Sequence, residues 1–581
     1  MGSFFKMFFA SLLAMIVFAL IAAFLIVGFV GALASDEKPE IADKSVLTLD
    51  LSQHFMERRQ NNPLAVLSND DNAIPGLYDV VRIIRHAKED EKIKGIYIIA
   101  NSNNNAFASS EELRNALQDF KTSKKFVIAH GDMMSESAYY VSNVADRLYA
   151  NPVGSVEWNG FSVNLLFLKG TLEKLNIQPQ IFYAGKFKSA TEPLRATQMT
   201  PENKLQTVEW LGDLYNHFLV KASQARKIDT ATLHQLANTG AIQDSKDALA
   251  NKLVDGLKYD DEVKDEIKKN IGIGKYDKLH LVPISTYAEA ISYKQSGSNR
   301  IALIYAEGNI VDGDGDKENI GGDAFVKLVR KARLDKSIKA IVFRVNSGGG
   351  SALASENIWR ELALAKADKP VVMSFGDVAA SGGYYIAAGA DSIFAQPNTI
   401  TGSIGVFTVI PNMKGFFNEK LGVTFDGVKT GTYADMGVDR PLTPAEQNFM
   451  QEGVDRIYLQ FKQRVAQGRK RDIAYIDSIA QGRVWSGEDA LRIGLVDKMG
   501  GLEEAVACAA RMAKVTDYRL REFPESRSWI NELLNKNEDQ PAAMLKQHLG
   551  EENFRIYQQM LEIKRISNGA QAKLPYQFII H

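Results

Sequence analysis

Two glycine-rich segments in the second half of the 581-residue chain contain residues suited to acyl-transfer chemistry. Residues 346–350 are Asn-Ser-Gly-Gly-Gly, and residues 380–383 are Ala-Ser-Gly-Gly. A serine between a strand and a helix is well placed as a nucleophile, and glycines let backbone N–H groups approach a carbonyl closely. Ser381 is therefore the candidate nucleophile, and the N–H of Gly382 would complete an oxyanion hole. Residues 401–406 bring another serine, Ser403, into this half.

The distribution of histidines excludes the commonest base for such a serine. His280 and His548 bracket the second half, with no histidine between them, so this half holds no Ser-His-Asp triad. His130, in the first half, matches Phe375 and is expected at a strand end. The remaining candidate is a lysine, whose pKa of about 10.4 would have to fall by about 3 units, as burial among apolar groups can achieve.

An internal repeat shows how the two halves differ at these segments. Residues 131–140 align with residues 376–385, which places Glu136 opposite Ser381. At the same offset, the three consecutive glycines of the second half are matched by asparagines at 103–105. The first copy therefore lacks the serine and the glycines.

The repeat also singles out one lysine. With a one-residue slip, residues 185–189 align with residues 431–435, and Lys188 is matched by Ala434. The second copy lacks this lysine, so the two copies together hold one catalytic set. Lys188 is the candidate general base.

Strands alternating with helices are expected to position these residues. In the second half the pattern predicts strands at 300–305, 338–345 and 370–375 and helices at 323–332 and 355–367. The first half repeats it at residues 46–50, 94–100, 110–120 and 125–130. Continuous apolar strands separated by helices predict an α/β fold with a mostly parallel sheet in each half. Thr-Pro pairs at 200–201 and 443–444 predict the start of two long helices, to about residues 226 and 468.

The N-terminus predicts membrane attachment. Residues 7–34 contain no charge, and about 20 such residues span a bilayer. We favour an uncleaved anchor over a signal peptide removed after Ala34, because a signal peptide has a shorter apolar region. Lys6 before the span and Asp36 and Glu37 after it favour the N-terminus inside and the bulk of the chain outside.

Composition excludes several other classes. A net charge of −1 gives no reason to expect nucleic acid as a partner. The single cysteine, Cys508, has no partner for an internal disulfide and is expected to be buried. Residues 312–316 begin like a calcium loop, but Lys317 and Asp323 stand where such a loop needs Gly and Glu. With no zinc-type cluster or phosphate-binding loop, no cofactor or metal is expected.

Four motifs, at residues 187–193, 344–351, 380–385 and 401–406, closely resemble those of the signal peptide peptidase A (protease IV) family in its long, duplicated bacterial form. The resemblance covers nearly the whole chain. It implies a Clp-protease/crotonase-like fold in each half and a homotetramer. It also implies hydrophobic peptide substrates, among them cleaved signal peptides, and a place in the bacterial inner membrane with the catalytic part on the periplasmic side.

The same resemblance implies a role for each site residue. Ser381 would be the nucleophile and Lys188 the general base of a Ser/Lys dyad. Ser403 would orient the lysine amine, and the N–H groups of Gly349 and Gly382 would hold the oxyanion.

The repeat and the resemblance divide the chain into an anchor (1–35), an N-terminal repeat with the lysine (36–285), a C-terminal repeat with the serine (286–522) and a helical tail (523–581). A charged stretch of the tail, residues 551–566, is expected to pack externally. Two alternatives stay open: an acyl-CoA enzyme of the crotonase type, and an anchored scaffold without activity. The sequence also leaves open the peptide preference, the subunit count, and whether the dyad forms within one chain.

Overall fold

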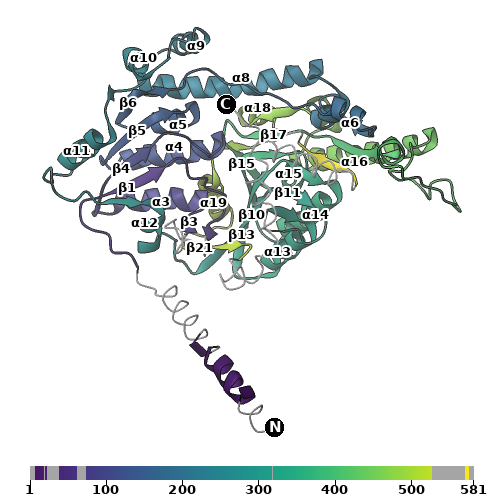
Figure 1. Ribbon diagram of the computed structural model, residues 1–581, viewed down its shortest axis with the longest axis horizontal. Helices are drawn as coiled ribbons and strands as arrows, with labels where there is room; N and C mark the ends of the chain where they lie inside the picture. The colour runs from purple at the N-terminus through teal and green to yellow at the C-terminus, as the bar shows by residue number, and fades with distance from the viewer. Residues whose placement is uncertain are drawn as a thin grey trace.

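The computed structural model describes residues 7–18, 20–21, 38–61, 73–316, 318–525 and 569–574. In these residues the chain is a mixed α/β protein, as predicted, with the sheet of the first repeat on the left of Figure 1 and the sheet of the second on the right. The helix at residues 7–18 and 20–21 projects away from the folded body (Figure 1). No helix in the described ranges is long and apolar enough to cross a membrane. The rest of the predicted span, its candidate cleavage point and the tail stretch 551–566 lie outside these ranges.

The first repeat forms a six-stranded sheet in which every strand pair is parallel. Its strands, in spatial order, are β8 (Gly256–Leu257), β6 (Arg147–Val156), β5 (Phe126–Met134), β4 (Ile93–Ile99), β1 (Ser45–Asp50) and β9 (Leu281–Pro283). His130 lies in β5 as a buried strand residue, with its ring Nε2 2.9 Å from the Lys258 carbonyl oxygen.

The second repeat forms an eight-stranded sheet that is parallel except where β17 meets β19. Six of its strands, in spatial order, are β19 (Val484–Ser486), β17 (Ile400–Gly402), β15 (Val371–Ala380), β13 (Ile338–Ser347), β10 (Asn299–Glu307) and β21 (Tyr518–Phe523). The other two form a branch, in which β16 (Ser392–Ala395) pairs with β15 and β20 (Lys498–Met499) pairs with β16. Apolar runs bury both faces of the central strands, which is typical of parallel sheets covered by helices.

Helices cover the sheets of both repeats. In the first they are α3 (Leu77–Glu89), α4 (Phe107–Lys121), α5 (Glu136–Ser142), α6 (Lys169–Lys174), the 3₁₀ helix η1 (Ser189–Thr191), α7 (Glu192–Arg195), α8 (Pro201–Arg226), α9 (Thr230–Asn238), α10 (Ser245–Ala250), α11 (Asp260–Asn270) and α12 (Ile284–Ala290). In the second they are α13 (Gly322–Leu334), α14 (Ala352–Asp368), α15 (Gly382–Ala387), the π-helix η2 (Phe416–Leu421), α16 (Pro444–Arg469), α17 (Ile473–Ile479), α18 (Gly487–Arg492) and α19 (Leu502–Met512). The predicted starts of the two long helices are confirmed, because Thr200 caps α8 and Thr443 caps α16. Cys508 is buried in α19.

A third sheet joins the two repeats and was not predicted. Its order is β12 (Asn319–Gly321), β11 (Asn309–Val311), β14 (Gly349–Ser351), β22 (Gln571–Lys573), β18 (Val406–Asn412) and β7 (Gln178–Ala184). Strand β7 of the first repeat pairs antiparallel with β18 of the second over seven residue pairs, from Val406 with Ala184 to Asn412 with Gln178. A separate short ribbon pairs β2 (Gln60–Asn61) with β3 (Ala73–Ile74).

A buried ionic cluster also holds the repeats together. The Arg344 guanidinium, fully buried in β13, lies 2.9 Å from a Glu57 carboxylate oxygen and 2.7 Å from one of Glu112. It also donates to Ser374 Oγ at 2.9 Å and to the Phe375 carbonyl at 3.0 Å. Both carboxylates come from the first repeat, so separating the repeats would leave buried charges without partners.

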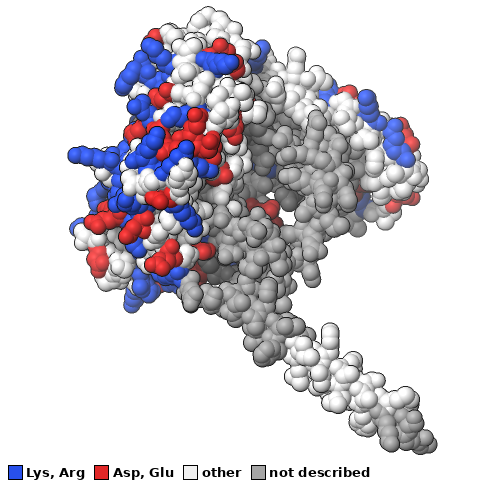
Figure 2. Space-filling view, turned by 60° about the vertical axis from the view of Figure 1, so that its left-hand side comes forward, with Lys and Arg blue, Asp and Glu red and all other residues white. Residues whose placement is uncertain are grey.

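Charge on the exterior is mixed. On the face shown in Figure 2, Lys and Arg side chains are interspersed with Asp and Glu, and no large basic area stands out on that face. This distribution agrees with the nearly neutral net charge of the chain.

Candidate active site

Ser381 occupies the sharp turn between β15 and α15. Its φ of 55° and ψ of −115° are unusual for a residue with a side chain, and such strained backbone concentrates at functional sites. The turn is held by two backbone hydrogen bonds of 2.8 Å, from Ser381 N–H to the Gly402 carbonyl and from Tyr385 N–H to the Ser381 carbonyl. Ser381 is fully buried.

Lys188 reaches this serine from the first repeat of the same chain. It follows β7, and its Nζ lies 2.8 Å from Ser381 Oγ. The same nitrogen lies 3.0 Å from Ser403 Oγ and 3.1 Å from the Ser403 carbonyl oxygen. Its counterpart in the repeat, Ala434, is exposed in a loop. The structure thus brings together three residues that the sequence analysis selected.

Burial lowers the pKa of Lys188 well below its usual value near 10.5. A neutral amine has two N–H donors and one lone pair. The two oxygens of Ser403 can accept the two N–H bonds, which leaves the lone pair free to accept the Ser381 hydroxyl proton. This is the proton direction that a general base requires.

The backbone around Lys188 is fixed from both repeats. Gln206 of α8 donates from Nε2 to the Phe187 carbonyl and to Ser189 Oγ, both at 3.1 Å. From the second repeat, the Gln481 carbonyl accepts from Phe187 N–H at 2.8 Å. A side chain at Gly482, where φ is 76°, would come within 2.7 Å of Lys188 Cβ, so only glycine fits against the lysine.

The two predicted oxyanion glycines lie next to each other. A methyl group built on Gly349 would be 2.6 Å from the Gly382 nitrogen, and φ at Gly349 is 94°. In this structure the Gly349 N–H donates to Ser347 Oγ at 3.1 Å. Gly349, the first residue of β14, therefore lies beside the turn that carries Ser381.

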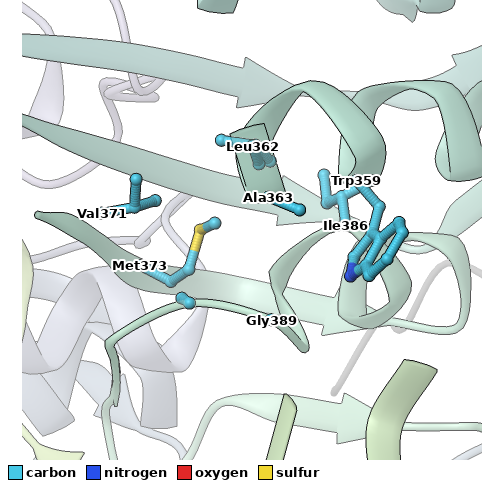
Figure 3. Close-up of a pocket in the computed structure, with 8 residues that line it drawn as sticks. Trp359, Leu362, Ala363, Val371, Met373, Ile386 and Gly389 are labelled. Carbon is cyan, nitrogen blue, oxygen red and sulfur yellow. The ribbon is translucent and has the colours of Figure 1, made fainter. Parts of the chain in front are cut away.

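A small cavity lies elsewhere in the second repeat. Figure 3 shows it between α14 and β15, and its volume is about 10 Å³, enough for one water molecule at most. Its lining is mostly apolar: Trp359, Leu362, Ala363, Val371, Met373, Ile386, Gly389 and Ala390. None of the predicted site residues contributes to it.

Two features of the site escaped the sequence analysis. One is Gln206, whose position on a long helix gives no sign of its contacts to the lysine loop. The other is strand β22, which pairs with β14 beside Gly349. Residues 570–574 alternate between apolar and polar, a pattern that predicts a strand and could have revealed it.

A serine hydroxyl paired with a buried amine is typical of serine hydrolases that use no histidine base. A comparison with known families agrees, because the model of peptidase family S49 matches residues 118–274 and 363–516. The chain belongs to peptidase family S49 and is a serine peptidase.

Relatives along most of the chain confirm the resemblance to signal peptide peptidase A in its long form. Protease 4 of Salmonella typhi is 36% identical over 537 residues, which cover 89% of this chain and 86% of the relative. Protease 4 of Haemophilus influenzae is 36% identical, with 81% and 80% covered. A chloroplastic serine protease SPPA of Arabidopsis thaliana is 32% identical, with 81% and 69% covered.

Proposed function

We propose that this serine peptidase is an endopeptidase with a Ser/Lys dyad, in which Ser381 is the nucleophile and Lys188 the general base. The observation that carries the proposal is the 2.8 Å separation of the two side-chain atoms in a site where both residues are buried. A carboxylate beside Lys188 would raise the pKa of its amine and keep it protonated. The cause that acts on this amine is burial, which lowers the pKa.

The proposed reaction begins with proton transfer from Ser381 Oγ to the neutral Lys188 amine. The serine oxygen attacks the peptide carbonyl, and the N–H groups of Gly382 and Gly349 stabilise the oxyanion, the latter after release from Ser347. Protonated Lys188 then gives its proton to the leaving amine as the C–N bond breaks. Water hydrolyses the acyl-enzyme, with the lysine again accepting a proton. Ser403 keeps the amine aligned through both steps.

A serine-reactive phosphonate tests the nucleophile. We expect one adduct on Ser381, found by peptide mass mapping, and no adduct in Ser381→Ala. Ser137→Ala is the matched control, because Ser137 lies in α5 directly after Glu136, the counterpart of Ser381, and it should label fully. An acyl-CoA enzyme or an inactive scaffold would give no adduct on Ser381.

The same reagent tests the base. Lys188→Met should label at least about 10³-fold more slowly, because the hydroxyl keeps its proton. Lys186→Met, which changes an exposed lysine two residues away, should label normally. Equal labelling of both variants would reassign the base.

The finer features follow from the resemblance. We propose a Clp-protease/crotonase-like fold for each repeat, a homotetramer, and signal peptides and other hydrophobic peptides as substrates. An anchor in the bacterial inner membrane, with the catalytic part periplasmic, is supported by the apolar side chains exposed at residues 7–18, 20 and 21, among them Phe18 at 74%. Carbonate extraction of membranes tests the anchor, sedimentation the subunit count, and digestion of a synthetic signal peptide the substrate class.

A further inference from the structure

A polar cavity in the first repeat lies among the C-terminal parts of three helices. Its volume is about 320 Å³, within the range of sites that bind small organic molecules. Three of its lining side chains are basic and none is acidic: Arg114, Gln118 and Lys121 of α4, Asn143, Val144 and Ala145 after α5, and Gln224, Ala225 and Lys227 at the end of α8. This composition favours an anionic ligand over a cationic or an apolar one.

Arg114 is the most deeply buried of these side chains, with 1% of its surface exposed. Its Nη1 donates to the Tyr140 carbonyl at 2.5 Å and to Asn143 Oδ1. Its Nη2 donates to the Lys221 carbonyl at 3.5 Å. Among the described residues, no hydrogen-bond partner is present for Arg114 Nε or for Asn143 Nδ2, although both atoms are buried. Two donors therefore remain unmatched at the cavity, where buried polar groups are normally paired.

The helix ends themselves do not repel an anion strongly. The last carbonyl groups of a helix carry partial negative charge, which an anion avoids unless cations compensate it. Here Arg114 occupies the Tyr140 and Lys221 carbonyls, as described above. Lys121 Nζ donates to the Val144 carbonyl at 2.7 Å. The carbonyls nearest to the cavity are thus already paired with cations.

The charges around the cavity do not cancel. Lys121 lies 2.8 Å from a carboxylate oxygen of Asp146, so these two charges compensate each other. Neither Arg114 nor the exposed Lys227 forms an ion pair within the ranges that the structure describes. Burial lowers the pKa of the Arg114 guanidinium, but an arginine is ionised far above neutral pH, so its charge remains. Two positive charges are left over, which matches a phosphate monoester with a charge of about −1.5 to −2.

The second repeat contains the same frame of helix ends. When the alignment of residues 131–140 with 376–385 is continued in both directions, Lys366 is the counterpart of Lys121. Lys366 Nζ donates to the Gly389 carbonyl at 2.9 Å and lies 3.4 Å from a carboxylate oxygen of Asp391. These contacts are equivalent to those of Lys121. The two places can therefore be compared residue by residue.

The contents of the two frames differ. Trp359 stands in place of Arg114, and Ala388 in place of Asn143. Beside the Trp359 indole only the apolar cavity of about 10 Å³ is left (Figure 3). Helix α16 also packs closely there, because a methyl group on Gly468 would clash with the Ala388 carbonyl oxygen. Packing of these helices thus needs neither the arginine nor the asparagine, so the open basic cavity of the first repeat requires another explanation.

From these observations we infer that the cavity of the first repeat is a binding site for a phosphate monoester. The ligand is either a free small molecule or a lipid headgroup, since both present the same dianionic group. Arg114 Nε and Asn143 Nδ2 supply the unmatched donors, and Lys227 supplies the second positive charge at the rim. None of Lys188, Ser381 and Ser403 lines the cavity, so this site goes beyond the proposed function.

Isothermal titration calorimetry of the full chain in detergent, with glycerol 3-phosphate as the ligand, tests this inference. The wild type should bind it, and neutral glycerol should give no binding. Arg114→Met should weaken binding at least about tenfold, because it removes a charged donor. Lys227→Glu should also weaken binding at least about tenfold, through charge reversal at an exposed residue that does not affect the buried core.

Lys124→Glu is the matched control for the charge reversal. Like Lys227, Lys124 is an exposed lysine with positive φ just after a helix, at 66° against 59°, but it does not line the cavity. Its affinity for glycerol 3-phosphate should equal that of the wild type. Equal affinity in the wild type, Lys227→Glu and Lys124→Glu would overturn the inference.

Dihexanoyl phosphatidic acid distinguishes the two sources of the phosphate. Binding at least about tenfold tighter than that of glycerol 3-phosphate indicates a lipid headgroup, because only the lipid adds apolar contacts. Equal affinities indicate a free phosphate monoester. No binding of either compound to the wild type would overturn the inference. Labelling of Ser381 by the phosphonate is measured separately, so failure of this site would leave the proposed function intact.

Discussion

The turn after β5 and the turn after β15 occupy equivalent places in the two repeats but have opposite chemistry. At the first, Glu136 is buried and accepts hydrogen bonds from the N–H groups of Asn159 and Gly160, at 2.9 and 3.0 Å. The residue before it has an ordinary φ of −71°. At the second, Ser381 has a positive φ and faces an amine. The Glu136 carboxylate is hydrogen-bonded within its own repeat, whereas the Ser381 hydroxyl has a partner, Lys188, from the other repeat.

The loops beside these turns differ in the same way. Asn103 uses its amide to bind Ser110 Oγ and the Ser137 carbonyl, at 2.8 and 3.0 Å, and Asn105 accepts from Phe55 N–H at 2.8 Å. At the matching positions of the second repeat, Gly349 and Gly350 instead pair through their backbone with β22. In the proposed function, the first repeat supplies the lysine and the second supplies the serine.

The largest effect is expected when the lysine is moved from the first repeat to the second. Lys188→Met should lower kcat/KM by about 10⁴-fold, and adding Ala434→Lys should restore nothing, because residue 434 is exposed in a loop. Peptide hydrolysis by the single and double variants measures this. Recovery in the double variant would mean that either repeat can supply the amine.

The next largest effect is expected on the free energy of unfolding, from loss of the buried ionic cluster. Arg344→Met should lower the free energy of unfolding by about 3–5 kcal/mol, because Glu57 and Glu112 would lose their common partner. Urea denaturation measures the change. Arg330→Met is a control with an exposed arginine that pairs with Glu361, and should cost about 1 kcal/mol or less. Equal effects would show that the cluster does not hold the repeats together.

A single methyl group added at Gly349 should lower kcat. Gly349→Ala forces a positive φ on alanine and places the methyl against neighbouring backbone, so we expect kcat to fall about 10²–10³-fold, as for loss of an oxyanion donor. Asn104→Ala, at the matching position of the first repeat, should leave kcat unchanged within about twofold. A comparable loss in the asparagine variant would contradict the contrast between the loops.

A pH series gives the smallest effect. Between the lowered pKa of folded Lys188 and its usual value in the unfolded chain, the unfolded state binds one more proton, so this group makes stability rise with pH by about 1.4 kcal/mol per unit. Methionine has no such proton. Lys188→Met should therefore be more stable than wild type at low pH within that range, with an advantage that shrinks as pH rises. A pH-independent difference in urea midpoints would show that folded Lys188 has an ordinary pKa.

Elements with local patterns could be predicted from sequence. The helix expected at 323–332 is α13 (Gly322–Leu334), and the one expected from Pro444 to about residue 468 is α16 (Pro444–Arg469). Strand β15 was expected at 370–375 but continues to Ala380, because its last residues pair with β17 and Ala379 also pairs with Ser347 of β13. Helix caps and apolar periodicity depend on residues that are close together in the sequence, so these elements could be predicted from it.

The third sheet depends on pairing between distant segments, which no local pattern reveals. Strand β7 meets β18 more than 200 residues further along the chain, and β22 arrives from near the C-terminus. The repeat comparison selected Lys188 and Ser381 as members of one set. Their meeting within a single chain depends on β7 and β18 lying side by side, so it could be recognised only in three dimensions.

The pairing of β7 with β18 has a consequence for biosynthesis. Ala184 finds its partner, Val406, only after the chain has been made well into its second half. Lys188 is therefore synthesised long before Ser381, and neither side chain alone makes up the pair. The order of translation therefore delays assembly of the pair of Lys188 and Ser381 until both repeats have been made.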